Sequence, residues 1–178
     1  REWQARVESL RAWCPELGLP DCSDAGLLSA LNDWLLPYLD GKWRLSDLEG
    51  ETFGEALRSR LDYTQRKQLD EYAPRELTVP SGMTRKLSYQ GGAPVLAVKL
   101  QELFGLADTP RIAKNKIAVI LHLLSPGQRP IQVTQDLKGF WERTYPEVRK
   151  ELKGRYPKHP WPDDPWTATP THRAKPRS

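Results

Sequence analysis

Cysteine and long apolar runs are scarce in this chain of 178 residues, and each scarcity excludes a class of protein. Its two cysteines, Cys14 and Cys22, have no third cysteine or nearby histidine, which is too few ligands for a structural zinc site. We expect both thiols to be free, since a disulfide would be unusual in a reducing compartment. No run of about 18 apolar residues is present, so no membrane span is predicted. The start lacks both methionine and a signal-peptide layout, so we expect a cytoplasmic segment of a larger protein.

The residue patterns that carry catalysis are missing as well. A P-loop needs a glycine five residues before its Gly-Lys pair, whereas Leu36 occupies that place ahead of Gly41-Lys42. Asp70-Glu71 lies in a charged helical stretch and not at the end of a strand, where an acidic box would hold Mg²⁺. The histidines are too far apart in sequence to chelate one metal ion: His122, His159 and His172. We therefore predict no catalytic residue, no metal site and no cofactor within this chain.

Charge is distributed unevenly along the chain. Residues 1–75 contain 10 Lys or Arg against 14 Asp or Glu, whereas residues 76–178 contain 17 against 9. Lysine and arginine neutralise phosphates and release their counterions. Any contact with a polyanion is therefore expected in the second half.

Apolar spacing predicts a helical first part. A stripe at intervals of three and four residues over 3–13 predicts one helix, and Ser23 is placed to cap a second. Thr52 and Glu55 have capping-box spacing, and another helix is expected from 65 to 72. Residues 1–75 are thus predicted to be a helical segment.

From residue 76 the apolar period changes to two, which favours strands. Strands are expected at 77–79, 87–89, 95–98, 117–124 and 131–133, with a helical turn or two over 100–106 and a type II turn at Pro126-Gly127. This order matches the chain order of an OB-type barrel, a fold that often binds oligonucleotides. The prediction is an α+β fold: a helical segment (1–75), then a domain (76–165) with a small five-stranded OB-like β-barrel or sheet and a C-terminal helix within 136–153, and a flexible, basic, proline-rich tail (166–178).

Basic and aromatic side chains alternate in the segment that starts at Trp141. Basic groups can follow phosphates while aromatic faces stack on unpaired bases, at about 1–3 kcal/mol per base. Aromatic residues anchored by prolines also commonly hold a chain end against its own domain, so both interpretations stay open. The candidate nucleic-acid-binding residues are Trp141, Arg143, Tyr145, Arg149, Lys150, Lys153, Arg155, Tyr156, Lys158 and Trp161.

The same segment carries a family resemblance. Gly139-Phe140-Trp141 followed by residues 145–165, from Tyr-Pro-Glu-Val-Arg-Lys to Pro-Trp-Pro-Asp-Asp-Pro, resembles the end of the HrpB-type ATP-dependent RNA helicases of bacteria, which are DExH-box proteins. Four further stretches are similar to the same C-terminal domain: 77–82, 94–98, 100–106 and 121–126. The resemblance implies that ATP and Mg²⁺ act in two RecA-like domains of the parent helicase, an ATP hydrolase, whose nucleotide-binding motifs this chain lacks.

What the resemblance implies for this chain is a non-catalytic accessory role. The module would contact RNA or single-stranded nucleic acid, the helicase core of the same polypeptide, or both. The alternative is an intramolecular scaffold or protein-interaction domain that makes no direct contact with RNA.

Overall fold

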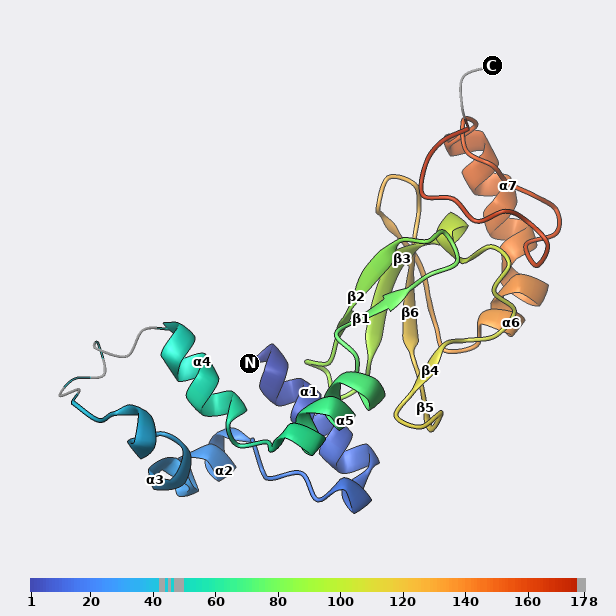
Figure 1. Cartoon of the computed structure of the whole chain (residues 1–178). Helices are drawn as coiled ribbons and strands as arrows, with labels where there is room; N and C mark the ends of the chain where they lie inside the picture. Colours follow the sequence, from blue (N-terminus) through green and yellow to red (C-terminus); the bar gives the residue numbers. More distant parts are fainter. Residues whose placement is uncertain (42–43, 45, 47–49, 176–178) are drawn as a thin grey trace. The chain divides into compact units, whose positions relative to one another are not determined.

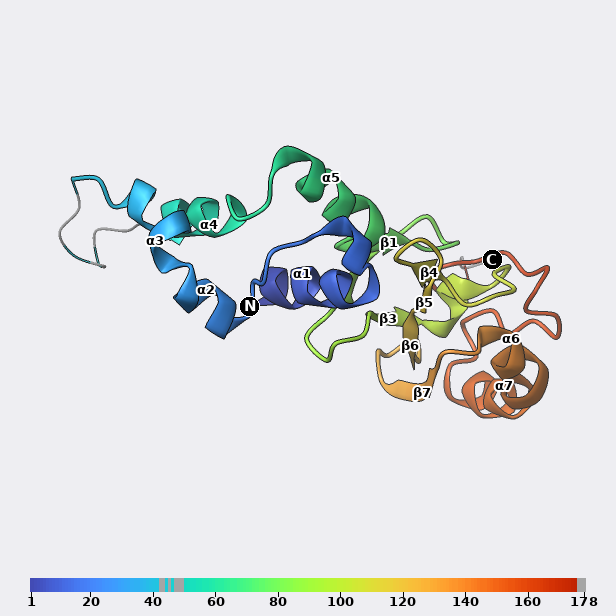
Figure 2. The ribbon, with the colours of Figure 1, turned by 90° about the horizontal axis from the view of Figure 1, so that it is seen from below.

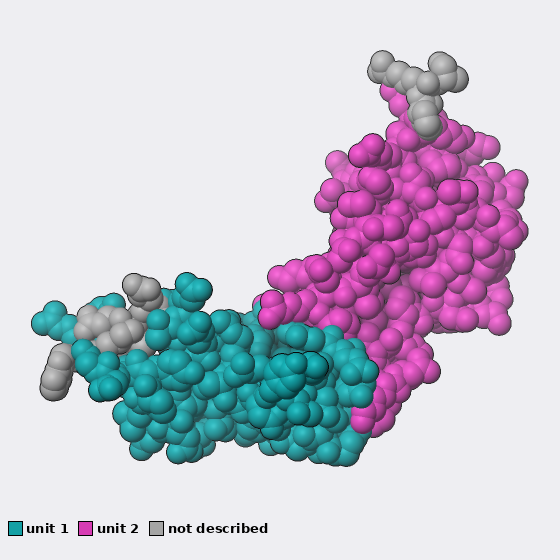
Figure 3. Space-filling model, viewed as in Figure 1, with its two compact units in different colours: residues 1–73 teal, residues 74–178 magenta. Residues whose placement is uncertain are grey.

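The computed structural model describes residues 1–41, 44, 46 and 50–175. It divides into two compact units, Arg1–Ala73 (unit 1) and Pro74–Ser178 (unit 2), which Figure 3 colours separately. Unit 1 is helical, whereas unit 2 contains every strand of the described residues (Figure 1). The α+β class predicted from the sequence is confirmed.

Unit 1 is built from short helices: α1 (Glu2–Trp13), η1 (Pro15–Leu17), α2 (Asp24–Ser29), α3 (Leu31–Trp34), η2 (Leu36–Tyr38), α4 (Gly50–Arg58) and α5 (Tyr63–Tyr72). The apolar stripe of α1 faces inward, where Val7 and Leu10 are fully buried. Ser23 caps α2 as predicted, because its hydroxyl accepts the Gly26 N–H at 3.1 Å. Both cysteines are buried free thiols, and burial raises the pKa of Cys22 to about 11.

The predicted capping box at Thr52 and Glu55 is wrong, because both residues lie inside α4. A capping box is present instead at the start of α5. There the Asp62 carboxylate accepts the Gln65 N–H at 2.8 Å, and the Gln65 amide oxygen accepts the Asp62 N–H at 3.1 Å. Asp62 therefore fixes where α5 begins.

Arg6 connects α1 to the end of α5. Its guanidinium is almost fully buried and donates to the carbonyl oxygens of Leu69 and Ala73, and it also pairs with Asp70. The last carbonyls of a helix have no partner within that helix, so they need donors from elsewhere. The Leu69 carbonyl also accepts the Ala73 N–H at 3.0 Å, whereas Arg6 supplies the donor for the Ala73 carbonyl.

Unit 2 contains a five-stranded sheet in the order β1 (Glu76–Thr78), β2 (Thr84–Ser88), β3 (Val95–Lys99), β6 (Ile120–Leu124) and β7 (Pro130–Thr134). Neighbouring strands are antiparallel except β3 and β6, which run parallel from Val95 opposite Ile120 to Lys99 opposite Leu124. One face of this pair is the core, lined by the buried side chains of Leu96, Val98, Leu121 and Leu123. The 3₁₀ helix η4 (Leu100–Leu103) follows β3 directly.

The sheet departs from the predicted barrel in two respects. Among the described strands, β1 and β7 stand at opposite edges and no ladder joins them, so closure into an OB-like barrel is not confirmed. The single strand predicted over 117–124 is interrupted at the buried Val119, and its first part, β5 (Ile117–Ala118), pairs with β4 (Arg111–Ile112) in a separate two-stranded sheet. The connection between β4 and β5 passes through three consecutive left-handed residues, Ala113–Asn115.

The hairpin between β6 and β7 is confirmed, but its turn is not of type II. A type II turn would give Gly127 a positive φ, whereas the positive φ of 61° falls on Gln128. The Gln128 N–H bonds to the Ser125 carbonyl at 2.8 Å, and the Ser125 N–H bonds to the Arg129 carbonyl at 2.8 Å. These bonds enclose a three-residue loop, whose usual conformation ends in a left-handed residue.

The C-terminal helix has three parts: α6 (Leu137–Gly139), η5 (Phe140–Thr144) and α7 (Tyr145–Arg155). Proline at position 146 has no N–H to continue an α-helical ladder, and the preceding turn is π-helical, with the Tyr145 N–H bonded to the Phe140 carbonyl. Residues 156–175 then return along the unit (Figures 1 and 2). Backbone bonds from Thr171 to Gln101 and from Lys175 to Lys158 attach the region predicted to be a tail.

Replacing Arg6 with methionine preserves much of the side-chain length but removes every donor. We expect the free energy of unfolding, measured by urea denaturation, to fall by about 1–3 kcal/mol, because the buried Ala73 carbonyl loses its donor and the Leu69 carbonyl loses one of its two donors. Asp70→Asn is the matched control and should cost less than about 1 kcal/mol, since the carboxylate is 71% exposed. Equal losses in the two variants would show that the stabilisation comes from the Arg6–Asp70 ion pair and not from the bonds to the carbonyls.

Candidate nucleic-acid interface

The candidate residues lie on η5, on α7 and on the returning segment 156–162, all in unit 2. Three of their aromatic side chains are buried: Trp141, Tyr145 and Trp161. Trp141 is 1% exposed and lies 5.9 Å from the ring of Phe104 and 5.3 Å from that of Tyr145, centroid to centroid. Its indole N–H donates to the Leu106 carbonyl at 2.8 Å. The ring is thus buried among other aromatic side chains, and its polar group is engaged inside the unit.

Tyr145 and Trp161 hold the returning segment against α7. The Tyr145 hydroxyl donates to the Pro162 carbonyl at 2.7 Å, and burial raises the pKa of that phenol. The Trp161 indole N–H donates to the Tyr156 carbonyl at 2.9 Å. Buried rings present no face to a base, so these two side chains and Trp141 are placed as internal anchors.

Arg149 and Tyr156 are also engaged within the unit. The Arg149 guanidinium donates to the carbonyls of Trp161 and Pro162 and pairs with Asp163 at 2.8 Å. The half-buried Tyr156 places its hydroxyl 3.3 Å from that of Ser125, beside the β6–β7 loop. Neither side chain is free to turn toward an external ligand without breaking these contacts.

The remaining candidates are exposed cations. Arg143 pairs with Asp136 at 2.9 Å, and Arg155 pairs with Glu151 at 3.6 Å. The Gly139 N–H and the Arg143 guanidinium hold the pKa of the Asp136 carboxyl below its usual value. Three lysines have no side-chain partner among the described residues: Lys150, Lys153 and Lys158. Lys150 and Lys153 are three residues apart on α7, which places them on the same side of the helix.

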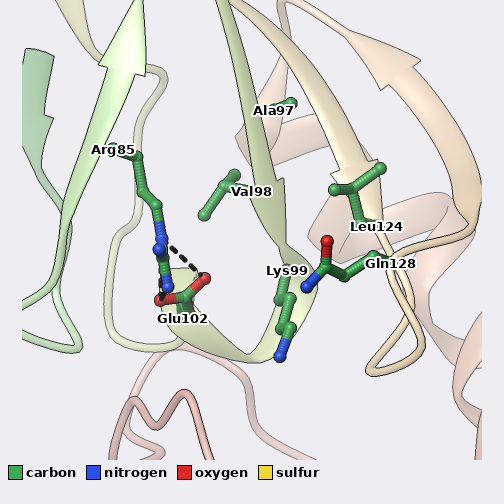
Figure 4. Close-up of a pocket in the computed structure, with 7 residues that line it drawn as sticks. All are labelled: Arg85, Ala97, Val98, Lys99, Glu102, Leu124 and Gln128. Atoms are coloured by element: carbon green, nitrogen blue, oxygen red, sulfur yellow. Dashed lines mark hydrogen bonds and ion pairs between the residues drawn. The ribbon is translucent and has the colours of Figure 1, made fainter.

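A second polar site was not predicted from the sequence. A pocket with a volume of about 130 Å³ lies beside the ends of β2 and β3, and its polar lining comes from Arg85, Lys99, Glu102 and Gln128 (Figure 4). Glu102 is 1% exposed, and its two oxygens accept from the Arg85 guanidinium at 2.7–3.2 Å. The one sequence signal was a carboxylate between the apolar residues Leu100 and Leu103, where an unpaired buried charge would be costly.

His159 lies near this pocket lining. Its ring Nδ1 is 3.1 Å from the amide nitrogen of the buried Gln101, an arrangement in which neutral histidine accepts the amide N–H. Burial lowers the pKa of His159, and the positive charge of Lys99 lowers it further. The folded chain therefore favours neutral His159.

Within the described ranges, no group of three or more His, Cys, Asp or Glu side chains is arranged to hold a metal ion. None of the helices described has the length and apolar character needed to cross a membrane.

Sequence and structure comparisons agree on a family. Residues 34–165 match the family model HrpB_C, described as ATP-dependent helicase C-terminal. The chain belongs to the HrpB_C family. This confirms the resemblance predicted from residues 139–165, and the match begins well before residue 76, within unit 1.

Named relatives of this HrpB_C chain come from Escherichia coli. It is 45% identical over 181 residues to the ATP-dependent RNA helicase HrpB of strain K12, covering 97% of this chain and 22% of the relative. A crystal structure of E. coli DExH-box NTPase HrpB matches with a TM-score of 0.90 at 44% identity, over 97% of this chain and 22% of that one. A structure of E. coli DEAH/RHA helicase HrpB matches with a TM-score of 0.74 at 42% identity, over 90% and 20%. The chain thus spans about a fifth of these helicases.

In this HrpB_C chain, Trp141→Ala removes the central ring of the aromatic cluster. We expect the free energy of unfolding to fall by about 3–5 kcal/mol, because a large buried side chain is lost and the Leu106 carbonyl loses its donor. Trp166→Ala is the matched control, since that ring is 38% exposed. Urea denaturation measures both, and a Trp141→Ala loss no larger than that of the control would refute the anchoring role.

His159 makes stability depend on pH. Because its folded-state pKa lies below the ordinary value of 6.5, the unfolded chain binds the proton more tightly. Stability from this group is complete above the unfolded pKa and declines as pH falls below it. We expect the urea midpoint of wild type to decrease between pH 7.5 and 5.0, and the decrease to be smaller in His159→Gln. Identical pH profiles would contradict this assignment.

Proposed function

We propose that this chain is a non-catalytic, RNA-contacting module of an HrpB-type ATP-dependent helicase. The observation that supports this most directly is the set of exposed lysines on α7 and just after it, Lys150, Lys153 and Lys158, which have no anionic partner among the described residues. Cations left unpaired on one segment attract a polyanion and gain the counterion-release free energy when it binds. A relative named as an RNA helicase makes RNA the polyanion of choice.

The proposed contact is electrostatic. With Trp141, Tyr145 and Trp161 buried, the candidate segment offers charges and not aromatic faces. Phosphate contacts position a strand but do not distinguish its sequence. The module would therefore hold RNA of any sequence, while ATP and Mg²⁺ act in the core of the parent helicase.

A second role, contact with the helicase core, is favoured by exposed apolar side chains in unit 1. Leu28 is 70% exposed and Leu36 is 53% exposed, and Phe53 and Tyr63 are exposed as well. Isolated apolar side chains are ordinary on protein surfaces, but several on one helical unit suit a contact with another domain. In this role the chain is an intramolecular scaffold, and RNA contact is not required.

Fluorescence anisotropy of a labelled single-stranded RNA, titrated with the chain over a range of salt concentrations, tests the RNA role. Each neutralised phosphate contributes about −0.7 to the slope of log K against log salt for a single strand. The triple variant Lys150→Gln, Lys153→Gln, Lys158→Gln should therefore bind more weakly, with a slope shallower by about 2.

The matched control replaces the same three lysines with arginine, which keeps the charges and should keep the slope near that of wild type. If wild type binds no RNA at any salt concentration, the RNA role fails and the scaffold role remains. If the triple glutamine variant keeps the wild-type slope, RNA contacts a surface other than these three lysines.

A further inference from the structure

The pocket of Figure 4 lies where the five-stranded sheet opens. The ladder between β2 and β3 contains only two pairs, Leu87 with Leu96 and Ser88 with Val95. Beyond them, β2 continues its pairing with β1, while β3 continues beside β6 up to Lys99 opposite Leu124. The ladder between β2 and β3 therefore ends here, and side chains from β2, β3, η4, β6 and the β6–β7 loop line the pocket (Figure 4).

The side chains that line the pocket have a net charge of +1, from Arg85, Lys99 and Glu102. Glu102 and Arg85 neutralise each other through a two-oxygen contact, and the Ser81 hydroxyl also donates to Glu102 at 3.1 Å. Lys99 has no ion pair or side-chain hydrogen bond among the described residues. Its half-buried stem reduces solvent screening, so its charge acts more strongly there than at an open surface.

The volume restricts what can enter. About 130 Å³ corresponds to roughly four water molecules at their share of liquid volume. Pockets for drug-sized ligands begin at about 300 Å³, so this space suits one small anionic group better than a whole nucleoside.

The geometry favours a tetrahedral anion over a planar one. A carboxylate binds best to the parallel N–H groups of an arginine fork, but Glu102 already occupies that fork. Two further donors lie on separate elements: the Lys99 ammonium at the end of β3 and the Gln128 amide on the β6–β7 loop (Figure 4). Separated donors suit the oxygens of a phosphate, and lysine binds phosphate as a point charge.

We propose that this pocket binds one phosphodiester group of a single-stranded RNA, with Lys99 as its charged ligand and Gln128 as a hydrogen-bond donor. Glu102 neutralises Arg85 at the side of the site, which leaves Lys99 as the uncompensated charge. The inference rests on the proposed RNA contact and assigns it a second attachment point, formed by elements that precede α7 in the sequence.

Lys99→Gln in the 178-residue chain tests the site by the same anisotropy titration. We expect RNA binding to weaken about 10-fold or more at low salt, as for loss of a hydrogen bond to a charged group, and the salt slope to become shallower by about 0.7. The control is Lys86→Gln, which adjoins Arg85 on β2 but does not line the pocket. It should bind RNA as wild type does.

Gln128→Gly separates binding from folding. Glycine accepts the positive φ of 61° more readily than glutamine, so the urea midpoint should rise. Loss of the amide should nevertheless weaken RNA binding by about 2- to 10-fold. A purely structural loop would not show these opposite changes.

The outcomes separate the two proposals. Wild-type binding with an unchanged Lys99→Gln variant overturns the pocket and leaves the RNA role of α7 intact, whereas absence of wild-type binding overturns both. Free inorganic phosphate is the other ligand that offers the same oxygens to Lys99 and Gln128. If phosphate at matched ionic strength shifts the NMR signals of Lys99 and Gln128 but RNA does not, the pocket takes the free ion and the RNA assignment is wrong.

Discussion

The burial of the Trp141 indole is the contact on which the organisation of unit 2 depends. Its ring meets Phe104, which follows η4 at the end of the sheet, and Tyr145, which begins α7. Tyr145 in turn bonds to the returning segment at Pro162. Sheet, helix and returning segment are therefore joined through one aromatic cluster, and the exposed side of α7 is determined by it.

This arrangement gives the aromatic and basic residues of one segment different tasks. The aromatic side chains and Arg149 fold inward to hold the chain, whereas Lys150 and Lys153 remain outside. A sequence in which the two kinds alternate is what a helix with one packed and one exposed side requires. The proposed RNA contact uses only what the packing leaves exposed, together with the pocket at the opening of the sheet.

Local patterns were predicted well from the sequence. The helical stripe of α1, the Ser23 cap and the β6–β7 hairpin all follow from spacing rules that involve neighbouring residues. The family resemblance rested on a long string of residues and was confirmed. Such features need no knowledge of the tertiary structure.

Features set by tertiary packing were not predictable in the same way. Composition could not separate buried from stacking aromatics, because both uses need the same residue types. The left-handed run Ala113–Asn115 contains alanine and lysine, which rarely adopt that conformation, so the β4–β5 pair gave no turn signal. The pocket joins Arg85, Lys99, Glu102 and Gln128, which only the fold brings together.

In the proposed contact, RNA is held through its phosphates and not by base stacking. Its most direct test compares the affinity of this chain for a single-stranded RNA and for an abasic oligomer of equal length and charge. A contact made to phosphates alone predicts equal affinities and equal salt slopes. A loss of about 1–3 kcal/mol per missing base would show that bases stack on aromatic side chains, and would contradict it.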